Sequence, residues 1–328
     1  MKPTFWILLA PLLLVGCDRP TETVSASSAA SSAEARALLE EIKAKLIFVE
    51  GGDFLMGDFG PEYGKDKVPY GGKDSDPLHP VTLSSYSIGK FKASNQEYQT
   101  YLRLTGQELP RYEARWQQKE WDDYNRLPDT PAHLDWNEAE RYCGWLAEVS
   151  GLPFALPTEA QWEYAARSRG QYLALATNNG DLDMVDINRG INIGAGTNRR
   201  EFANKMKLST GIYSALPGDS FPPNALGIYD MAANGLEWTS DWYDPDYYRI
   251  SPRIDPQGPT EPVFKNNQGK FVKTVRGNDY ANGMATRTSV GRAHRSLDTE
   301  YVSTMTVRCV VNQPQPVALD TGDGQKKS

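Results

Sequence analysis

The sequence predicts an α+β fold of short helices, short strands and many turns, in one large domain or two small ones. Three observations lead to this prediction. Glycine (28 residues) and proline (22 residues) are frequent in a chain of 328, and both favour turns and interrupt regular elements. Aromatic residues make up 11% of the chain and supply material for a core. Capped helical segments alternate with brief β-like runs, which excludes a bundle of long helices.

Composition and charge narrow the classes of function. With 39% hydrophobic and 23% charged residues, the chain fits a soluble globular protein rather than a disordered one. Its formal net charge of −7 disfavours nucleic acids and anionic membrane surfaces as main partners. We therefore expect no nucleic-acid binding.

Residues 1–16 have the form of an export signal: one lysine, an apolar run too short to span a bilayer, and then Leu-Val-Gly before Cys17. This ending resembles a bacterial lipoprotein signal, which implies cleavage before Cys17 and lipidation of that residue as the membrane anchor. The alternative is an ordinary secretory signal in which Cys17 has no such role. Both predict export. Asp18 resembles the signal that retains a lipoprotein in the inner membrane, facing the periplasm.

The rest of the chain divides into a tether, a domain and a tail. Residues 17–36 are rich in Ser, Ala and Thr, and we expect a lipidated cysteine followed by a flexible tether. The domain should cover residues 37–312, and residues 313–328 should form a disordered tail. Apolar residues at helical spacing predict a short helix over residues 33–46 that docks one face on the domain; they are Leu38, Leu39, Ile42 and Leu46.

Three segments carry signals for both ends of a helix. Each begins with a capping box, in which two residues three positions apart satisfy each other's backbone amides, and each ends at a glycine. The segments are Ser94–Gly106 with Glu97, Asp135–Gly151 with Glu138, and Thr158–Gly170 with Gln161. In the second, Cys143 shares an apolar face with Ala139, Tyr142, Leu146 and Val149. Its side chain should therefore point into the core.

The motifs along the chain resemble a known family. Short β-like runs (LIFVEGGDFLMG, HPVTLSSYSIG, KTVRG, TVRCVV) accompany LPTEAQWEYAAR and PNALGIYDMAANGLEWTSDWY, in the order expected of the formylglycine-generating enzyme, or sulfatase-modifying factor, family. The resemblance covers about residues 46–312. It implies a single compact α+β domain of the C-type-lectin-like kind, low in regular secondary structure. That expectation agrees with the turn-rich composition.

Enzymes of this family oxidise a substrate cysteine to formylglycine with molecular oxygen, using two copper-binding cysteines that follow an Arg-Gly-Gly-Ser-like turn. Here the turn is Arg276–Tyr280, and counting onward without a gap puts the two positions on Arg287 and Arg292. Residues 276–296 contain no cysteine. Copper(I) favours thiolate ligands, and a guanidinium has no lone pair for a metal. We therefore expect no copper, no catalytic residue and no formylglycine-generating activity.

The sequence holds three cysteines, Cys17, Cys143 and Cys309. With Cys17 lipidated, two remain, and an even remainder in an oxidising periplasm favours a disulfide. The family resemblance implies the same pairing, because Cys143 and Cys309 match two positions that form a structural bridge. The alternative is two separately buried thiols.

The run Asp230–Glu237 (DMAANGLE) matches the family's second calcium loop, in which the first, fourth, sixth and eighth residues supply the ligands. The resemblance implies a structural calcium ion held by the side chains of Asp230 and Glu237 and by the carbonyls of Ala233 and Gly235. Hard oxygen ligands of this mixture suit calcium. The alternative is a tight turn whose carboxylates cap local amides.

Two other arrangements are candidates for catalysis. The histidines His79, His133 and His294 lie far apart in the sequence, and two of them would have to converge with a carboxylate to hold non-haem iron. We favour structural roles for them. Glu159 and Glu163 have the i, i+4 spacing of a paired acid and base on a helix. We favour a solvated face, or a salt bridge from Glu163 to Arg167.

These points lead to a hypothesis of a catalytically inactive, periplasmic lipoprotein that binds a protein partner. The resemblance points to type VI secretion, because members without the cysteines occur near such genes as accessory factors or as immunity proteins that inhibit effectors such as lipases. The alternative is an enzyme of the family with rewired oxidative chemistry on a periplasmic substrate.

A basic segment is the candidate partner-binding surface. Four side chains within nine residues predict a positive patch where the family places its substrate groove: Arg287, Arg292, His294 and Arg295. Arginine pairs bidentately with carboxylates and stacks on aromatic rings, so an acidic partner is expected. The alternative is that these arginines are buried in ion pairs with the domain's own acids, such as Asp279 or Asp298.

Overall fold

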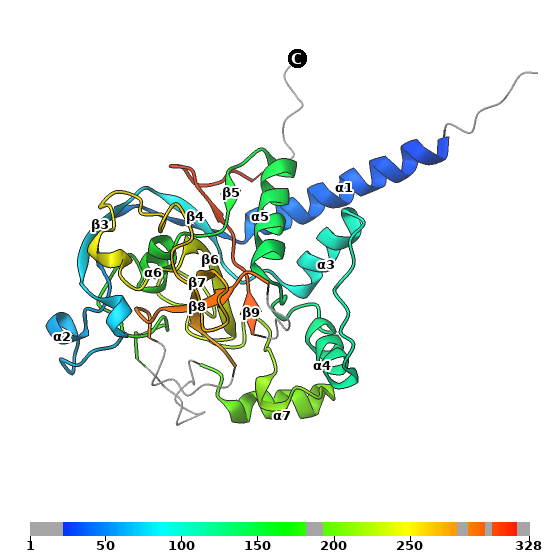
Figure 1. The fold of residues 1–328 in the computed structure, drawn as a ribbon. Helices are drawn as coiled ribbons and strands as arrows, with labels where there is room; N and C mark the ends of the chain where they lie inside the picture. Colours follow the sequence, from blue (N-terminus) through cyan, green and yellow to red (C-terminus); the bar gives the residue numbers. More distant parts are fainter. Residues whose placement is uncertain (1–21, 182–192, 281–287, 299–303, 320–328) are drawn as a thin grey trace, which may run out of the picture.

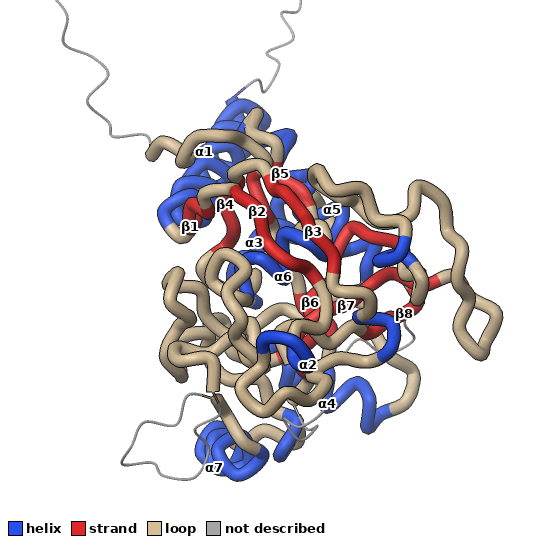
Figure 2. The backbone as a smooth tube through the Cα atoms, turned by 90° about the vertical axis from the view of Figure 1, so that its left-hand side faces the viewer, coloured by secondary structure: helices blue, strands red, loops and turns tan. Residues whose placement is uncertain are grey.

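A computed structural model describes residues 22–181, 193–280, 288–298 and 304–319 (Figure 1). Short elements alternate with long loops, which Figure 2 shows in tan. The helices are α1 (Glu22–Ala44), α2 (Gly60–Tyr63), α3 (Asn95–Leu104), α4 (Arg115–Asn125), α5 (Trp136–Ser150), α6 (Glu159–Ala166) and α7 (Gly196–Met206). The strands are β1 (Leu46–Val49), β2 (Gly52–Met56), β3 (His79–Leu83), β4 (Tyr86–Gly89), β5 (Phe154–Ala155), β6 (Gly235–Trp242), β7 (Val272–Asn278), β8 (Ala293–Ser296), β9 (Met305–Thr306) and β10 (Val310–Val311). The predicted α+β fold is confirmed.

The strands of the described residues form three small sheets. One has the order β1-β4-β10-β5, one pairs β2 with β3, and one has the order β8-β7-β6-β9. All pairings are antiparallel except that of β9 with β6. Because β9 and β10 belong to different sheets and are separated by three residues, the segment Met305–Val311 joins the two larger sheets. Arg308 and Cys309 therefore lie between them.

The three capping boxes are present as predicted. At the start of α3, the Glu97 amide donates to Ser94 Oγ (3.2 Å) and the Ser94 amide donates to Glu97 Oε2 (2.9 Å). The same reciprocal contacts begin α5 and α6. Helix α5 ends at Gly151, which adopts a left-handed conformation (φ 68°). These local signals placed the starts of three helices because each signal lies within a single turn.

Some boundaries and faces differ from the sequence prediction. Helix α6 ends at Ala166 rather than near Gly170, and residues 168–170 have positive φ. A Cβ atom at Gly170 would lie 2.3 Å from the Phe54 Cβ, so this turn requires glycine. On α5, Val149 is 40% exposed rather than buried. Helices α2, α4 and α7 were not predicted.

Helix α1 is longer than expected. It begins at Glu22, within the segment 17–36 that we expected to be a flexible tether, and that expectation is wrong from Glu22 onward. Leu38 and Leu39 are buried, and the helix contacts α3 and α5 while its N-terminal part projects from the body (Figure 1). None of the described helices is both long and apolar enough to cross a membrane. Cys17 and Asp18 lie outside the described residues, so the lipid anchor stays a prediction, as does disorder in the tail.

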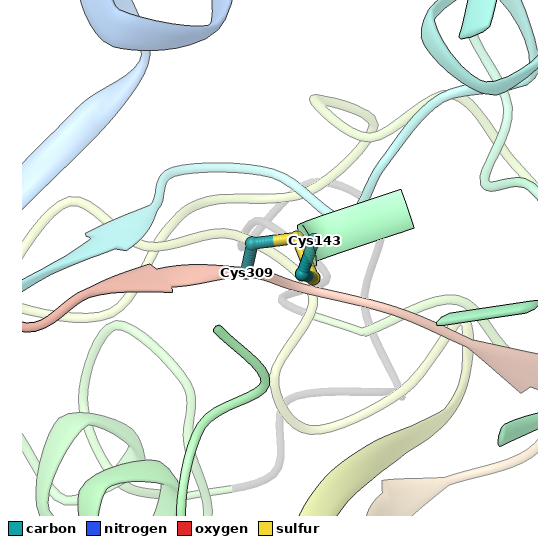
Figure 3. The surroundings of a disulfide bond; sticks show 2 residues. All are labelled: Cys143 and Cys309. Atoms are coloured by element: carbon teal, nitrogen blue, oxygen red, sulfur yellow. A yellow bond between two sulfur atoms is a disulfide. The ribbon is translucent and has the colours of Figure 1, made fainter. Parts of the chain in front are cut away.

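A disulfide links helix α5 to the segment between β9 and β10 (Figure 3). The Cα atoms of Cys143 and Cys309 are 5.8 Å apart, and the two residues are separated by 166 positions in the sequence. Both belong to an apolar cluster that includes residues of α3, α5 and β6. The predicted pairing is confirmed, and the alternative of two separate thiols is excluded.

Candidate functional site

The position that the resemblance gives to a catalytic thiol holds a buried arginine. The side chain of Arg292 is fully buried. Its guanidinium donates two hydrogen bonds to Glu159, from Nε to Oε1 (2.7 Å) and from Nη2 to Oε2 (3.0 Å). Nη1 donates to the backbone carbonyls of Asp74 (2.6 Å) and Asp244 (3.1 Å). Arg292 is therefore not part of an exposed binding patch, and that prediction is wrong. The alternative of a buried ion pair holds, with Glu159 as partner.

Glu163 on α6 is held in the same way. Its Oε1 accepts from Arg167 Nη1 (2.7 Å), and its Oε2 accepts from Arg276 Nη2 (2.9 Å). Arg276 Nη1 also donates to Glu159 Oε1 (2.8 Å). These five residues, which we call the Glu159 cluster, have side chains no more than 2% exposed: Glu159, Glu163, Arg167, Arg276 and Arg292. The predicted Glu163–Arg167 salt bridge is confirmed, whereas the solvated face is wrong.

The electrostatics of the Glu159 cluster argue against acid–base chemistry. Burial alone would raise the pKa of Glu159, but the charges of Arg292 and Arg276 and their hydrogen bonds outweigh it and lower that pKa. A general acid or base needs a pKa near the working pH and access to substrate. Glu159 has neither, so this pair of carboxylates is structural.

One further carboxylate touches the Glu159 cluster. Asp241 on β6 accepts from the backbone amide of Glu159 (2.9 Å) and from Ser240 Oγ (3.1 Å). Burial, reinforced by the negative charge of Glu159, raises the pKa of Asp241 to about 7. No sequence pattern singled out Asp241.

The three histidines are packed in separate ring contacts. His133 Nε2 lies 2.7 Å from the hydroxyl of Tyr280, and burial with the nearby Lys92 charge lowers the pKa of His133 to about 3. His79 lies against Tyr248 (ring centroids 4.7 Å apart), and His294 lies against Tyr243 (4.6 Å). In the part of the chain that the structure describes, no three His, Cys, Asp or Glu residues gather closely enough for a metal ion.

The remaining residues of the predicted patch divide between two situations. His294 and Arg295 lie on β8, an edge strand of its sheet, and are partly exposed. Arg295 Nη1 donates to the carbonyl of His294 (2.9 Å). Arg287 lies outside the described residues. Of the four residues of the predicted patch, His294 and Arg295 are therefore the two that the described structure places at this edge.

The loop that resembles a calcium site holds a second group of buried charges. Glu237 has a fully buried side chain. Arg308 donates two hydrogen bonds to it, from Nε to Oε2 (3.0 Å) and from Nη2 to Oε1 (3.1 Å). Lys92 Nζ lies 2.9 Å from Glu237 Oε1, and Trp162 Nε1 donates to Oε2 (3.1 Å). Burial would raise the pKa of Glu237, but the two cations outweigh it and lower that pKa to about 2.

The other predicted calcium ligands are placed as follows. The Gly235 carbonyl accepts from Lys92 Nζ (2.7 Å), and Asp230 Oδ2 accepts from Asn234 Nδ2 (2.8 Å). Ala233 donates its amide to the carbonyl of Asp230, which closes the turn (3.3 Å). Burial raises the pKa of Asp230 to about 6, although Lys92 opposes the shift. We call Asp230, Glu237, Lys92 and Arg308 the Glu237 cluster. Its oxygens are not a free set of ligands, because Lys92 already engages two of them.

Sequence reasoning predicted Arg167 as a partner of Glu163 but missed the ion pairs of Arg276, Arg308 and Lys92. Arg276 and Arg308 stand inside the β-like runs KTVRG and TVRCVV, where a charge among apolar residues is a signal of a buried, paired group. Lys92 lies in GKFKASN, a segment that reads as an ordinary polar turn. Two backbone hydrogen bonds on either side of Lys92 attach this segment to the domain, from Tyr229 N to Lys90 O (3.0 Å) and from Ala93 N to Val307 O (2.9 Å).

Comparison with known proteins agrees with the fold. The sequence model of one protein family, the sulfatase-modifying factor enzyme 1-like domain, matches residues 32–313 of this chain. The formylglycine-generating enzyme of Streptomyces coelicolor is 29% identical over 252 residues, which cover 65% of this chain and 74% of that protein. The inactive C-alpha-formylglycine-generating enzyme 2 of Mus musculus is 26% identical over 240 residues, covering 61% of this chain and 70% of that protein.

Among solved structures, PvdO from Pseudomonas aeruginosa has a similar fold. The two structures superpose with a TM-score of 0.58 at 23% sequence identity, covering 81% of this chain and 93% of PvdO. At this level of identity the similarity concerns the fold alone.

Proposed function

We propose that this chain, which belongs to the family of sulfatase-modifying factor enzyme 1-like domains, is a member that binds a protein partner and does not oxidise cysteine. The observation that carries the proposal is Arg292. At a position where the resemblance expects a thiol, its guanidinium is buried and committed to Glu159. No cysteine occurs within residues 276–296 to take over the role, and arginine offers a metal no lone pair.

Two further points support loss of catalysis with retention of the scaffold. A relative from mouse is itself described as inactive, so activity is not a property of every member of this family. The Glu159 cluster also gives the former thiol position a structural use, since Arg292 ties the segment before β8 to helix α6. A fold can keep its framework while the function moves to another part of its surface.

The proposed setting is the periplasmic face of a bacterial inner membrane, with the protein anchored through Cys17 and sorted by Asp18. Helix α1 has 23 residues and is therefore about 35 Å long. Its projecting half would hold the domain away from the anchor as a semi-rigid spacer. We propose as partner a component of type VI secretion, in particular a lipase effector that this protein would inhibit.

The proposed contact surface is the edge of β8 with His294 and Arg295. An edge strand presents backbone groups to a partner, and a guanidinium beside it adds bidentate recognition of a carboxylate. We therefore propose that the partner brings an acidic segment to this edge.

Binding is tested with the purified soluble domain and a lipase effector encoded beside its gene. Arg295→Glu should weaken binding by tenfold or more, which corresponds to about 1.4 kcal/mol, and the melting temperature of the variant is measured alongside so that loss of binding is separated from loss of folded protein. Arg249→Glu is the matched control, because Arg249 is an exposed arginine away from β8 whose ion pair joins it to the nearby Asp246. Equal binding by wild type and Arg295→Glu would reject this edge as the contact surface, and lack of binding or of lipase inhibition would reject the effector.

Catalysis is tested separately with a sulfatase-derived peptide that contains the substrate cysteine, supplied with copper and oxygen. Mass spectrometry should show no formylglycine. Conversion of the peptide, or stoichiometric copper or iron in the purified protein together with oxygen consumption, would instead support an enzyme with rewired oxidative chemistry.

A further inference from the structure

Lys92 ends in the middle of the loop that resembles a calcium site. Its side chain is 1% exposed. The ammonium lies 2.7 Å from the Gly235 carbonyl, 2.9 Å from Glu237 Oε1 and 3.4 Å from Thr306 Oγ1. An ammonium group has three hydrogens to donate, so these three oxygens account for all of them.

The surrounding backbone holds this arrangement in place. Gly235 has φ +105°, and a Cβ atom there would lie 2.5 Å from Thr306 Cγ2, so only glycine lets the loop approach β9. Asn234 fastens the turn, because its Oδ1 accepts from Arg199 Nη1 and from the Leu216 amide, both at 3.0 Å. The loop is thus shaped by residues that do not depend on a bound ion.

From these contacts we infer that the Lys92 ammonium is the built-in cation of this loop and stands where the family resemblance would place calcium. Two of the four predicted ligand oxygens, from Gly235 and Glu237, accept hydrogen bonds from Nζ. The loop is therefore a metal-free turn whose positive charge is covalently part of the chain.

Charge balance supports the inference. The two acids of the Glu237 cluster, Asp230 and Glu237, face two cations, Lys92 and Arg308, and Arg199 also acts on Asp230. No excess negative charge remains to attract a divalent ion. A calcium ion on the same oxygens, at about 2.3–2.6 Å from each, would also lie beside Nζ and be repelled by it.

The test begins with the wild-type protein. Thermal unfolding in a chelator and in calcium at about 1 mM, where extracellular modules bind this ion, should give the same melting temperature, and calorimetric titration should detect no binding. A ligand that binds only the folded state would raise the melting temperature. A stoichiometric calcium signal that Asp230→Ala abolishes would overturn the inference.

The second step removes the ammonium. Lys92→Ala should lower the melting temperature and make it rise again with calcium, because the Gly235 and Glu237 oxygens become available. Lys273→Ala is the matched control: Lys273 is another buried lysine, held by the Ser240 carbonyl (2.7 Å) on β6. This control should lose stability without gaining a calcium response. A folded Lys92→Ala protein that ignores calcium would contradict the inference, and if that variant does not fold, the wild-type titration decides.

Discussion

The two buried charge clusters differ in the cations that pair with their carboxylates. In the Glu159 cluster, two carboxylates face three arginines, and the segment concerned is one that the family resemblance links to thiol chemistry. In the Glu237 cluster, two carboxylates face a lysine and an arginine, and the loop is one that the resemblance links to a metal. A planar guanidinium group can donate two parallel hydrogen bonds to one carboxylate, whereas an ammonium is a compact point charge. In the Glu159 cluster, arginine guanidinium groups therefore join α6 to β7 and to the segment before β8. In the Glu237 cluster, the ammonium of Lys92 lies at the centre of a turn.

Both clusters join elements that lie far apart in the sequence. Arg292 and Arg276 connect α6 to β7 and to the segment before β8. Lys92 and Arg308 connect the loop of β6 to the ends of β4 and β9, since Arg308 also donates to the Gly89 carbonyl (2.7 Å). In both places the protein's own cations satisfy buried carboxylates that would otherwise be costly to bury.

The largest expected effect comes from neutralising the central acid of each cluster. Glu159→Gln leaves the Arg292 charge without its carboxylate, and Glu237→Gln does the same to Lys92 and Arg308. Removing one partner of a buried ion pair costs about 3–5 kcal/mol. We expect each variant to lose that amount of unfolding free energy in chemical denaturation.

An exposed ion pair provides the control for both variants. Glu50 pairs with Arg169 at 2.9 Å, but their side chains are 68% and 44% exposed. Glu50→Gln should therefore change the unfolding free energy by about 0–1 kcal/mol. If Glu159→Gln were as mild as Glu50→Gln, the ion pairs of the Glu159 cluster would not be what holds Arg292 in place.

A second, smaller effect is expected from the disulfide, and it should separate the clusters. Cys309 adjoins Arg308, so replacing both cysteines by serine should loosen the Glu237 cluster while leaving the Glu159 cluster in place. The expected loss is about 2–4 kcal/mol. Hydrogen exchange should speed up along residues 305–311 more than along α6. Equal acceleration in both segments would show that the two clusters are not independent, and a reductant should have no effect on the double serine variant.

The sequence predicted features whose signals are local or belong to the family. The starts of α3, α5 and α6 followed from residues three positions apart, and the Cys143–Cys309 pairing followed from an even cysteine count together with the resemblance. The end of α6 was predicted four residues too late, because the contact of Gly170 with Phe54 is made by residues distant in the sequence.

Sequence patterns did not reveal the burial of Arg292 and Lys92. Arg292 was expected on a surface, yet it points to Glu159, which is 133 residues away in the chain. Lys92 reaches a loop more than 140 residues later. Neither pairing has a periodic or local signature, because it depends on how sheets and loops meet in the folded domain. A basic segment in an acidic protein therefore indicates charge but not exposure.

The smallest expected effect is a pH dependence of stability from Asp241, the carboxylate that contacts the Glu159 cluster. Burial, with the charge of Glu159, raises the pKa of Asp241 to about 7, against 3.8 for the ordinary side chain. The folded state then holds a proton that the unfolded chain has released, so this group's contribution to stability is lost as the pH rises through about 7. Between about pH 6 and pH 8 the loss is about 1 kcal/mol.

Asp241→Asn should remove this part of the decline in melting temperature, because an amide does not titrate and its oxygen can still accept from the Glu159 amide. The exposed Asp246→Asn variant should decline like wild type. If Asp241→Asn declined just as steeply as wild type, another group would be responsible and Asp241 would have to be ionised throughout this range.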